Sequence, residues 1–357
     1  MSRTENSVGV ALRGVTKRYG EVTAVDCIDL DIEPGTMITL LGPSGCGKTT
    51  TLRLIAGLDL PTSGKILING EDVSTLSANH RDVSMVFQSY ALFPHMTVGD
   101  NVGYGLKVMR QPEGERRERV SASLRAVGLD GYQGRYIDQL SGGQQQRVAV
   151  ARALVLKPKV LLFDEPLSNL DTKLRRQMRE DIRRLQRETG ITSIYVTHDQ
   201  AEALAVSDDI VVMDVGRIAQ HGSPEDIYRR PTSSFVATFM GEANILDGEL
   251  KRDGDGPALC IGDTEVGFDI DTGSIAAGPV KVAVRPESIR LGDGAAGGNL
   301  LRGTVKWRSY VGSATEYLVR RGDQEVLVVM PAGAPRFEEG DEVTLVIDPV
   351  GVAIVPE

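Results

Sequence analysis

The stretch Gly42–Thr50, GPSGCGKTT, constrains the fold of this 357-residue chain more than any other. It fits the pattern G-x-x-x-x-G-K-[ST], with the apolar run MITLL before it and the helical stretch TTTLRLIAG after it. In this context the glycines let the backbone wrap around phosphate oxygens, and the helix N-terminus adds its dipole. The sequence therefore predicts a strand–loop–helix unit that binds the phosphates of a nucleotide.

Several residues of this loop have a definite chemical role. Lys48 would bring a compact positive charge to the β- and γ-phosphates, and Thr49 would offer a hydroxyl group to Mg²⁺. Cys46 lies near Lys48 and a helix N-terminus, a setting that lowers the pKa of a thiol. We therefore expect alkylation of Cys46 to inactivate the protein and ATP to protect it. The predicted nucleotide-binding residues here are Gly42, Pro43, Ser44, Gly45, Cys46, Gly47, Lys48, Thr49 and Thr50.

Two carboxylates follow the apolar run KVLLF that begins at Lys159. A buried strand that ends in acids is unfavourable unless the acids meet a cation. Asp164 is predicted to hold Mg²⁺, directly or through water, and Glu165 to polarise an attacking water as general base. General-base catalysis of this kind contributes roughly 10²- to 10⁴-fold in rate.

A second glycine-containing loop, LSGGQ at Leu140–Gln144, runs into the helical stretch QQRVAVARAL. This loop resembles the signature sequence of the ABC ATPases, the nucleotide-binding subunits of ABC transporters. The first loop and the Asp–Glu pair fit the same family. The resemblance covers the whole first domain and implies ATP and Mg²⁺ as ligands. It also implies that the signature acts on a second copy, which would sandwich two ATP molecules in a homodimer. The signature residues are Leu140, Ser141, Gly142, Gly143 and Gln144.

Further residues match the family in order along the chain. Tyr19 resembles the aromatic residue that stacks on adenine, and Ala24 the small residue in the same pocket. Gln88 matches the loop glutamine that senses Mg²⁺ and the γ-phosphate, and His198 matches the histidine that orders the attacking water. The resemblance thus implies Glu165, His198 and Gln88 as catalytic residues and Thr49, Gln88 and Asp164 as Mg²⁺ ligands. The loop that meets the opposite site is Ser168, Asn169, Leu170 and Asp171, with Asn169 where the family more often has Ala.

A basic stretch at residues 172–188 follows that loop. Leu174, Met178, Ile182 and Leu185 form one apolar stripe at helical spacing, and most arginines fall outside it. We interpret the arginines as a solvated face and Asp171 as the N-cap of the helix. The net charge of −9 argues against nucleic acid as a partner.

The composition predicts two domains. Residues 1–240 alternate β-rich runs with helical stretches, as in an α/β domain with a largely parallel sheet, and the resemblance to the ABC ATPases implies a helical subdomain within it. Residues 241–357 contain short alternating runs and a hairpin around RRGDQ, which predict a small all-β barrel. The segment VRPESI and its flanks resemble the transport-associated OB-type domain of importer ATPases, which implies a role in regulation and dimerisation.

The N-terminal stretch MSRTENSVGV has no long apolar core, so we expect no signal peptide, and no apolar run approaches the length of a membrane span. The resemblance therefore implies a cytoplasmic protein on the inner face of the membrane, with two membrane permease subunits and a solute-binding protein as partners. The segment after Gln88, with Tyr90, Leu92, Phe93 and Pro94, is either a permease-docking surface or core.

The solute is less constrained. The segment FVATFMGEANIL resembles the corresponding segment in ATPases of ferric iron, polyamine or phosphonate importers more than that in ATPases of sugar importers. A sugar importer ATPase, a non-transport ABC ATPase and a P-loop kinase remain as alternatives, although a kinase would not explain the signature, Glu165 or His198.

Overall fold

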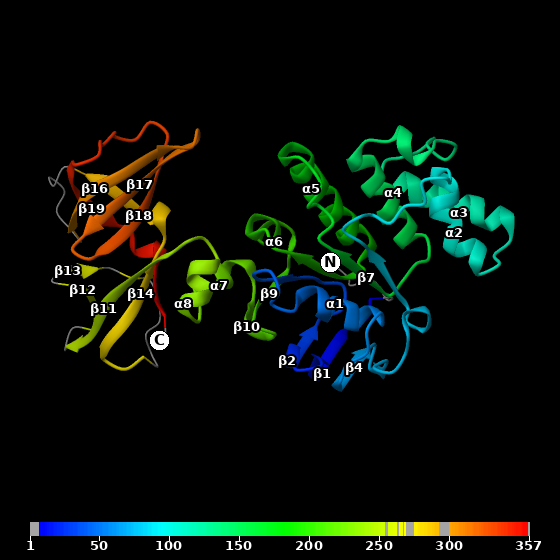
Figure 1. The fold of residues 1–357 in the computed structure, drawn as a ribbon, viewed down its shortest axis with the longest axis horizontal. Helices are drawn as coiled ribbons and strands as arrows, with labels where there is room; N and C mark the ends of the chain where they lie inside the picture. The colour runs from blue at the N-terminus through cyan, green and yellow to red at the C-terminus, as the bar shows by residue number, and fades with distance from the viewer. Residues whose placement is uncertain are drawn as a thin grey trace. The chain divides into compact units, whose positions relative to one another are not determined.

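The structure is a computed structural model that describes residues 7–253, 256–262, 264–266, 268, 275–292 and 300–355. Its contacts divide the chain into two compact units, Met1–Pro224 and Glu225–Glu357 (Figure 1). The first unit is α/β and the second is built of β-sheets, so the predicted fold class is confirmed.

A six-stranded sheet forms the centre of the first unit, with strand order β10-β9-β3-β8-β7-β6. The strand pairs are parallel, except that the edge strand β10 is antiparallel to β9. Strand β7 places Leu162 in one apolar cluster and Leu161 and Phe163 in another, so both faces of the sheet are buried. Burial on both faces explains why these strands are nearly continuous apolar runs in the sequence. The strands are β3 (Met37–Leu41), β6 (Val83–Val86), β7 (Val160–Asp164), β8 (Thr192–Thr197), β9 (Asp209–Asp214) and β10 (Arg217–Gly222).

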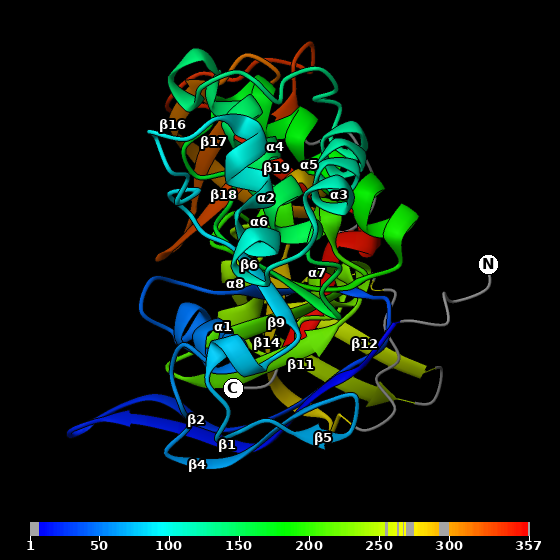
Figure 2. The ribbon, with the colours of Figure 1, turned by 90° about the vertical axis from the view of Figure 1, so that its right-hand side faces the viewer.

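An antiparallel sheet with order β2-β1-β4-β5 accompanies the central sheet and was not predicted from the sequence. Helix α1 (Lys48–Ala56) lies between the two sheets (Figure 2), where its Leu52 and Ile55 join a shared apolar cluster. The register of β1 against β2 shifts repeatedly between Leu12 and Arg18, which interrupts the alternation that would reveal a strand. The strands are β1 (Val10–Tyr19), β2 (Val22–Ile32), β4 (Ser63–Ile68) and β5 (Glu71–Asp72).

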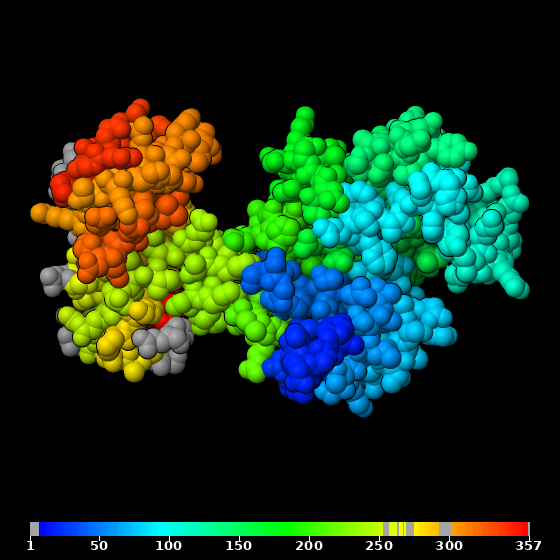
Figure 3. Space-filling view, viewed as in Figure 1, coloured from blue at the N-terminus to red at the C-terminus, as the bar shows by residue number. Residues whose placement is uncertain are grey.

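Three helices form a lobe with an apolar core of its own, which includes Val102, Leu124 and Val148. Figure 3 shows the α2 and α3 part of this lobe in cyan at the edge of the first unit. None of the helices within the described residues is both long and apolar enough to cross a membrane. The helices are α2 (Val98–Val108), α3 (Glu113–Ala126) and α4 (Gly142–Leu154), with α5 (Thr172–Thr189) and α6 (Gln200–Val206) outside the lobe.

The second unit consists of two five-stranded antiparallel sheets around one apolar core. The predicted hairpin is present, since β17 and β18 pair from Ala314 with Pro331 to Arg321 with Gln324. The first sheet contains β11 (Asn244–Asp253), β12 (Gly256–Ile261), β13 (Thr264–Val266), β14 (Gly278–Val284) and β20 (Val352–Val355), and the second contains β15 (Ile289–Gly292), β16 (Leu300–Tyr310), β17 (Ala314–Arg321), β18 (Gln324–Pro331) and β19 (Glu342–Ile347).

A buried arginine, Arg285, joins two short helices to this second unit. Its guanidinium donates hydrogen bonds to the carbonyl oxygens of Tyr228, Ala237 and Met240. These bonds hold the ends of α7 (Pro224–Arg229) and α8 (Ser234–Phe239) against the β-strands. For this reason the contacts divide the chain after Pro224, whereas the composition predicts a boundary after residue 240.

Candidate active site

The glycine-containing loop lies between β3 and α1, as the sequence predicts. Gly47 is the N-cap of α1 with φ 103°, and a Cβ atom there would lie 2.5 Å from the carbonyl oxygen of Ala24. A Cβ atom on Gly42 would lie 2.3 Å from the carbonyl oxygen of Met213. Both positions therefore require glycine, and the backbone of Ala24 lies against the loop.

Lys48 is held inside this loop. Its side chain is buried, and the ammonium donates hydrogen bonds of 2.8 Å to the carbonyl oxygens of Gly42 and Pro43. A buried ammonium needs such partners because its desolvation is unfavourable. The loop thus keeps a positive charge at the N-terminus of α1, where an anionic phosphate is favoured.

The environment of Cys46 contradicts the expected low thiol pKa. The residue is 3% exposed, and burial raises the pKa of its thiol. The ammonium of Lys48, 3.7 Å from the sulfur, opposes this shift without overcoming it. The expectation of an activated thiol was wrong because burial outweighs the nearby positive charge.

Thr49 and Asp164 meet at the carboxyl end of β7. The Thr49 hydroxyl donates to Oδ1 of Asp164 over 3.3 Å. Burial raises the pKa of Asp164, the Thr49 hydrogen bond opposes this shift, and the negative charge of Glu165 adds to it. Within the described residues no arginine, lysine or histidine forms an ion pair with Asp164. A half-buried carboxylate beside a hydroxyl is a set of hard oxygen donors that fits Mg²⁺.

Glu165 and His198 follow the neighbouring strands β7 and β8. The backbone of Glu165 has φ 43°, and its N–H donates to the carbonyl oxygen of Val196 over 3.1 Å. Its Oε2 lies 3.3 Å from Nδ1 of His198. A left-handed conformation is uncommon for a non-glycine residue. Here it accompanies the placement of a carboxylate directly against an imidazole.

The loop Ser168–Asp171 contacts two of the other predicted site segments. Asn169 donates from Nδ2 to the carbonyl oxygen of Gln88 over 3.0 Å. The Ser168 hydroxyl donates to the carbonyl oxygen of Glu165 over 3.1 Å. The Ser168–Asp171 loop therefore contacts both Glu165, the candidate general base, and Gln88, and Asn169 makes the contact with Gln88.

Tyr19 is the last residue of β1. Its ring is half-exposed, and the Lys17 ammonium lies 4.8 Å from the ring centroid. Its hydroxyl donates to Asp59 over 3.2 Å. An exposed aromatic ring with an anchored hydroxyl is suited to stack on a base.

The signature loop begins α4 through a reciprocal cap. The Ser141 hydroxyl accepts from the Gln144 N–H, and the Gln144 side chain accepts from the Ser141 N–H. A Cβ atom on Gly143 would lie 2.8 Å from the Leu174 side chain, whereas one on Gly142 would just touch Leu170. The glycine at 143 thus allows α4 to approach α5 closely.

The two glycine-containing loops lie on elements that belong to different cores of the first unit. Helix α1 packs between the two sheets, whereas α4 contributes to the core of the helical lobe. Figures 1 and 2 both show α1 and α4 in different parts of the unit. Within one chain, the helices that follow the two glycine-containing loops therefore lie in different parts of the unit.

Helix α5 behaves as predicted at its start and along its apolar stripe. Asp171 is its N-cap and accepts from the Leu174 N–H over 3.0 Å. Met178, Ile182 and Leu185 are buried, with Leu174 packed beside them. The cap fixes the end of the Ser168–Asp171 loop to a rigid element.

Arg175 was expected to belong to the solvated face of this helix, and its role in the site could not be seen from the helical pattern. Its guanidinium donates to the carbonyl oxygen of Leu170 over 3.1 Å, and it lies 3.5 Å from Asp199 and 3.7 Å from Glu202. The arginine thus connects the Ser168–Asp171 loop to the turn that follows His198. The pair of acids just after the histidine could have suggested a cationic partner.

Glu202 is the buried member of this group. Its carboxylate accepts hydrogen bonds from the Thr197 hydroxyl over 2.9 Å and the Tyr195 hydroxyl over 3.1 Å. Burial raises its pKa, the Thr197 hydrogen bond opposes that shift, and Asp199 adds to it. Asp199 in turn is the N-cap of α6.

In the segment after Gln88, some side chains lie in the core and others lie at the surface, where a permease subunit could dock. Tyr90 is buried in the core, so its ring does not take part in a docking surface. Phe93 lines a surface groove of about 500 Å³ and packs against Tyr104 with ring centroids 4.8 Å apart. Arg152 donates to the carbonyl oxygens of Tyr90 and Ala91, both over 2.7 Å.

Comparison with known families identifies the class of protein to which this site belongs. Residues 25–168 match the ABC transporter family, and residues 282–354 match the TOBE domain. The chain belongs to the ABC transporter family, and it is an ATPase. The resemblance expected from the LSGGQ stretch is thereby confirmed.

Relatives and solved structures agree with this assignment. The Fe(3+) ions import ATP-binding protein FbpC of Photobacterium profundum is 51% identical over 359 residues, 99% of each chain. The protein of the same name from Escherichia coli is 51% identical over 348 residues, 98% of each chain. A dimeric post-hydrolysis structure of the ATP-binding cassette MJ0796, bound to ADP and Pi, gives a TM-score of 0.54 at 33% identity, over 60% of this chain and 98% of that one.

Proposed function

We propose that this ATPase powers the import of ferric ions through separate membrane subunits. The observation that supports this solute is that relatives 50–52% identical over 97–99% of the chain are named Fe(3+) ions import ATP-binding proteins. The segment FVATFMGEANIL, which is closer to iron, polyamine or phosphonate importers than to sugar importers, agrees with it. The chain would act from the cytoplasmic side, beside two permease subunits that receive iron from a solute-binding protein.

The site residues divide the work of ATP hydrolysis. Lys48 and the loop amides hold the β- and γ-phosphates, and Tyr19 with Ala24 receives the adenine. Thr49 and Asp164, with Gln88 nearby, would hold Mg²⁺, which neutralises the charge that develops on the phosphates. Glu165 accepts a proton from the attacking water. The contact between Glu165 and His198 orients the carboxylate, and the imidazole faces the γ-phosphate.

We propose that the active unit is a homodimer in which Ser141 of one chain completes the site of the other. The separate positions of α1 and α4 in the fold support this arrangement. Free N–H groups at the start of α4 favour an anion, and Gly142 and Gly143 leave room for one. The second unit, with its TOBE domain, is proposed to stabilise the dimer and to regulate it.

The groove beside Phe93 is proposed to receive a helical segment of a permease subunit. Its apolar walls include Leu58, Met85, Tyr104 and Leu156. Exposed apolar grooves of this kind commonly bind amphipathic helices. Because Arg152 fixes the backbone next to Gln88, movement in the groove would reach the site through that loop.

Uptake measurements with the catalytic variant Glu165→Gln test this function. Cells that carry only the variant should take up radiolabelled ferric ions no faster than cells without the chain, while putrescine uptake stays unchanged. Normal iron uptake together with lost uptake of putrescine, a phosphonate or a sugar would refute the iron assignment and identify the alternative solute.

A further inference from the structure

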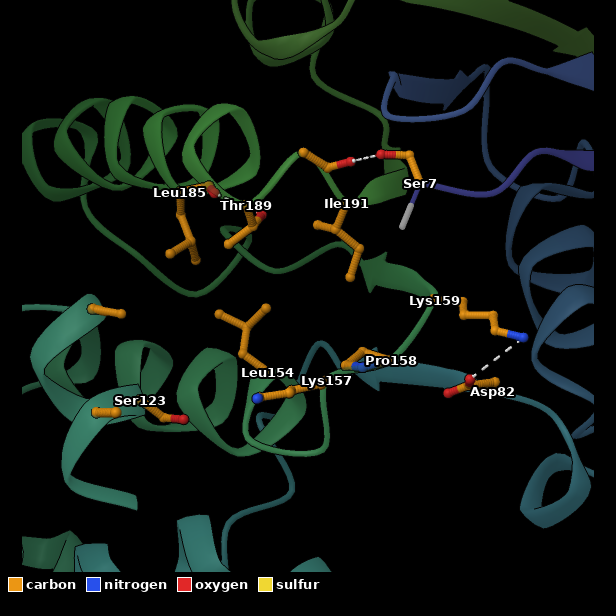
Figure 4. Close-up of a pocket in the computed structure, with 13 residues that line it drawn as sticks. Ser7, Asp82, Ser123, Leu154, Lys157, Pro158, Lys159, Leu185, Thr189 and Ile191 are labelled. Carbon is orange, nitrogen blue, oxygen red and sulfur yellow. Dashed lines mark hydrogen bonds and ion pairs between the residues drawn. The ribbon is translucent and has the colours of Figure 1, made fainter. Parts of the chain in front are cut away.

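A cavity of about 590 Å³ lies in the first unit and contains none of the predicted ATP-site residues (Figure 4). Ser123 and Leu154, from α3 and α4, line one side together with Lys157 and Pro158. Leu185 and Thr189 from α5, and Ile191 just before β8, face them from the other side. Cavities of about 300–1,000 Å³ are the size that small-molecule ligands occupy.

The lining combines apolar walls with one excess positive charge. The apolar part comes from Ala122, Ala126, Leu154, Pro158, Leu185 and Ile191. The charged lining residues are Asp82, Lys157 and Lys159, so two positive charges face one negative charge.

These three charged side chains are not equally engaged. Lys159 lies 3.9 Å from Asp82, whereas Lys157 has no acidic partner among the residues that the structure describes. Lys157 lies in a turn with φ 55°, and its backbone N–H donates to the carbonyl oxygen of Leu154 over 2.8 Å. The turn places an exposed ammonium beside the apolar wall, a combination suited to an amphipathic monoanion.

The cavity lies at the far ends of elements that carry the ATP-site motifs. Helix α4 starts after the signature residue Ser141 and ends at Leu154, and α5 starts after Asp171 and ends at Thr189. Strand β7 begins after Lys159 and ends at Asp164. Strand β8 follows Ile191 and leads to His198.

A ligand here would touch the helical lobe through α3 and α4 and the central sheet through α5 and β8. Rigid helices and strands transmit small displacements along their length. A bound ligand would therefore bias the position of the signature helix relative to the loops that hold Asp164 and His198.

We propose that this cavity binds a small amphipathic monoanion, with Lys157 holding the anionic group, and that binding regulates ATP hydrolysis. Such a site is separate from the ATP site and from the Phe93 groove. Allosteric coupling in proteins commonly changes affinity by about 5- to 150-fold. An effect of several-fold on the ATPase rate is therefore the expected scale.

The probe for the test is 1-anilinonaphthalene-8-sulfonate, a fluorescent amphipathic monoanion. It is titrated into the full chain with saturating ADP and Mg²⁺, so that the nucleotide site is occupied. Lys157→Gln should weaken its binding about five-fold or more, because the ammonium is lost. The neutral analogue N-phenyl-1-naphthylamine should bind wild type and Lys157→Gln about equally.

Two further variants make the assignment specific. Ala126→Trp fills the cavity from the exposed end of α3 and should abolish specific binding of both probes. Lys107→Gln removes an exposed lysine of α2 outside the cavity and should change nothing. All three variants should keep the ATPase rate of wild type without probe.

The outcomes separate binding from regulation. The proposal stands if saturating sulfonate changes the wild-type ATPase rate about three-fold or more and Ala126→Trp removes the change. Equal sulfonate affinity in wild type, Lys157→Gln and Ala126→Trp would overturn the binding site. Specific binding without any change in ATPase rate would overturn the regulatory role.

Discussion

Replacing Arg175 by Met should reduce both stability and turnover, although its neighbour Arg176 can be replaced freely. Arg175 is about one-third exposed, and it contacts the carbonyl oxygen of Leu170 and the carboxylates of Asp199 and Glu202. A hydrogen bond from a charged group contributes about 1.5–3 kcal/mol, and the variant also leaves Glu202 buried without its cation. After allowance for solvent screening, we expect a loss of about 2 kcal/mol.

Thermal unfolding of the full chain measures this loss. For a unit of this size, about 2 kcal/mol corresponds to a decrease in Tm of about 4–8 °C. Arg176→Met is the matched control, because Arg176 is mostly exposed and, among the described residues, its one ion pair is the 3.6 Å contact with Glu180 one turn away. That control should stay within about 0.5 kcal/mol of wild type.

The kinetic readout distinguishes positioning from general destabilisation. Among the residues that the structure describes, Arg175 forms hydrogen bonds and ion pairs with the Ser168–Asp171 loop and the turn after His198, and none with the phosphate loop. At a temperature where the variant is folded, kcat should fall about ten-fold while KM for ATP changes less than about three-fold. Arg175→Lys should recover part of kcat. If Arg175→Met has the same Tm and the same kcat as Arg176→Met, the proposed role of Arg175 is refuted.

Two other consequences follow from buried groups. N-ethylmaleimide at pH 7 should modify the exposed Cys27 well before Cys46, because burial shields the Cys46 thiol and raises its pKa; peptide mass spectrometry that shows equal labelling would contradict this. Burial raises the pKa of Glu202 in the folded state above its unfolded value of 4.5, so ionisation of this carboxyl destabilises the fold. The stability linked to Glu202 is therefore present below pH 4.5 and is lost as the pH rises through the higher folded pKa. Unfolding in urea should therefore show Glu202→Gln gaining stability relative to wild type as pH rises through this range, and a pH-independent difference would argue against it.

The central sheet and phosphate loop could be predicted from the sequence because their physical signals are local. Strands buried on both faces are continuous apolar runs, and a loop such as Gly42–Thr50 has its function in its own backbone. Asp171 likewise reveals its capping role through the helix that follows it. In these cases the neighbours in sequence are also the neighbours in space.

The remaining features depend on contacts between distant segments. The antiparallel sheet is interrupted by register shifts, and Arg175 acquires its role only through acids that follow β8. Cys46 was misjudged because a sequence shows the nearby lysine but not the degree of burial. Arg285 similarly ties residues before the predicted domain boundary to strands that follow it.

The central claim is that the signature loop of one chain completes the ATP site of another. The direct measurement is ATP hydrolysis by a mixture of two inactive variants, Lys48→Ala and Ser141→Arg. Random pairing puts about half of the chains in heterodimers, each with one intact site, so roughly a quarter of wild-type activity is expected if the sites fire independently. If cross-linking demonstrates heterodimers and the mixture is no more active than either variant alone, the result would contradict ATP sites that are shared between two chains and work independently.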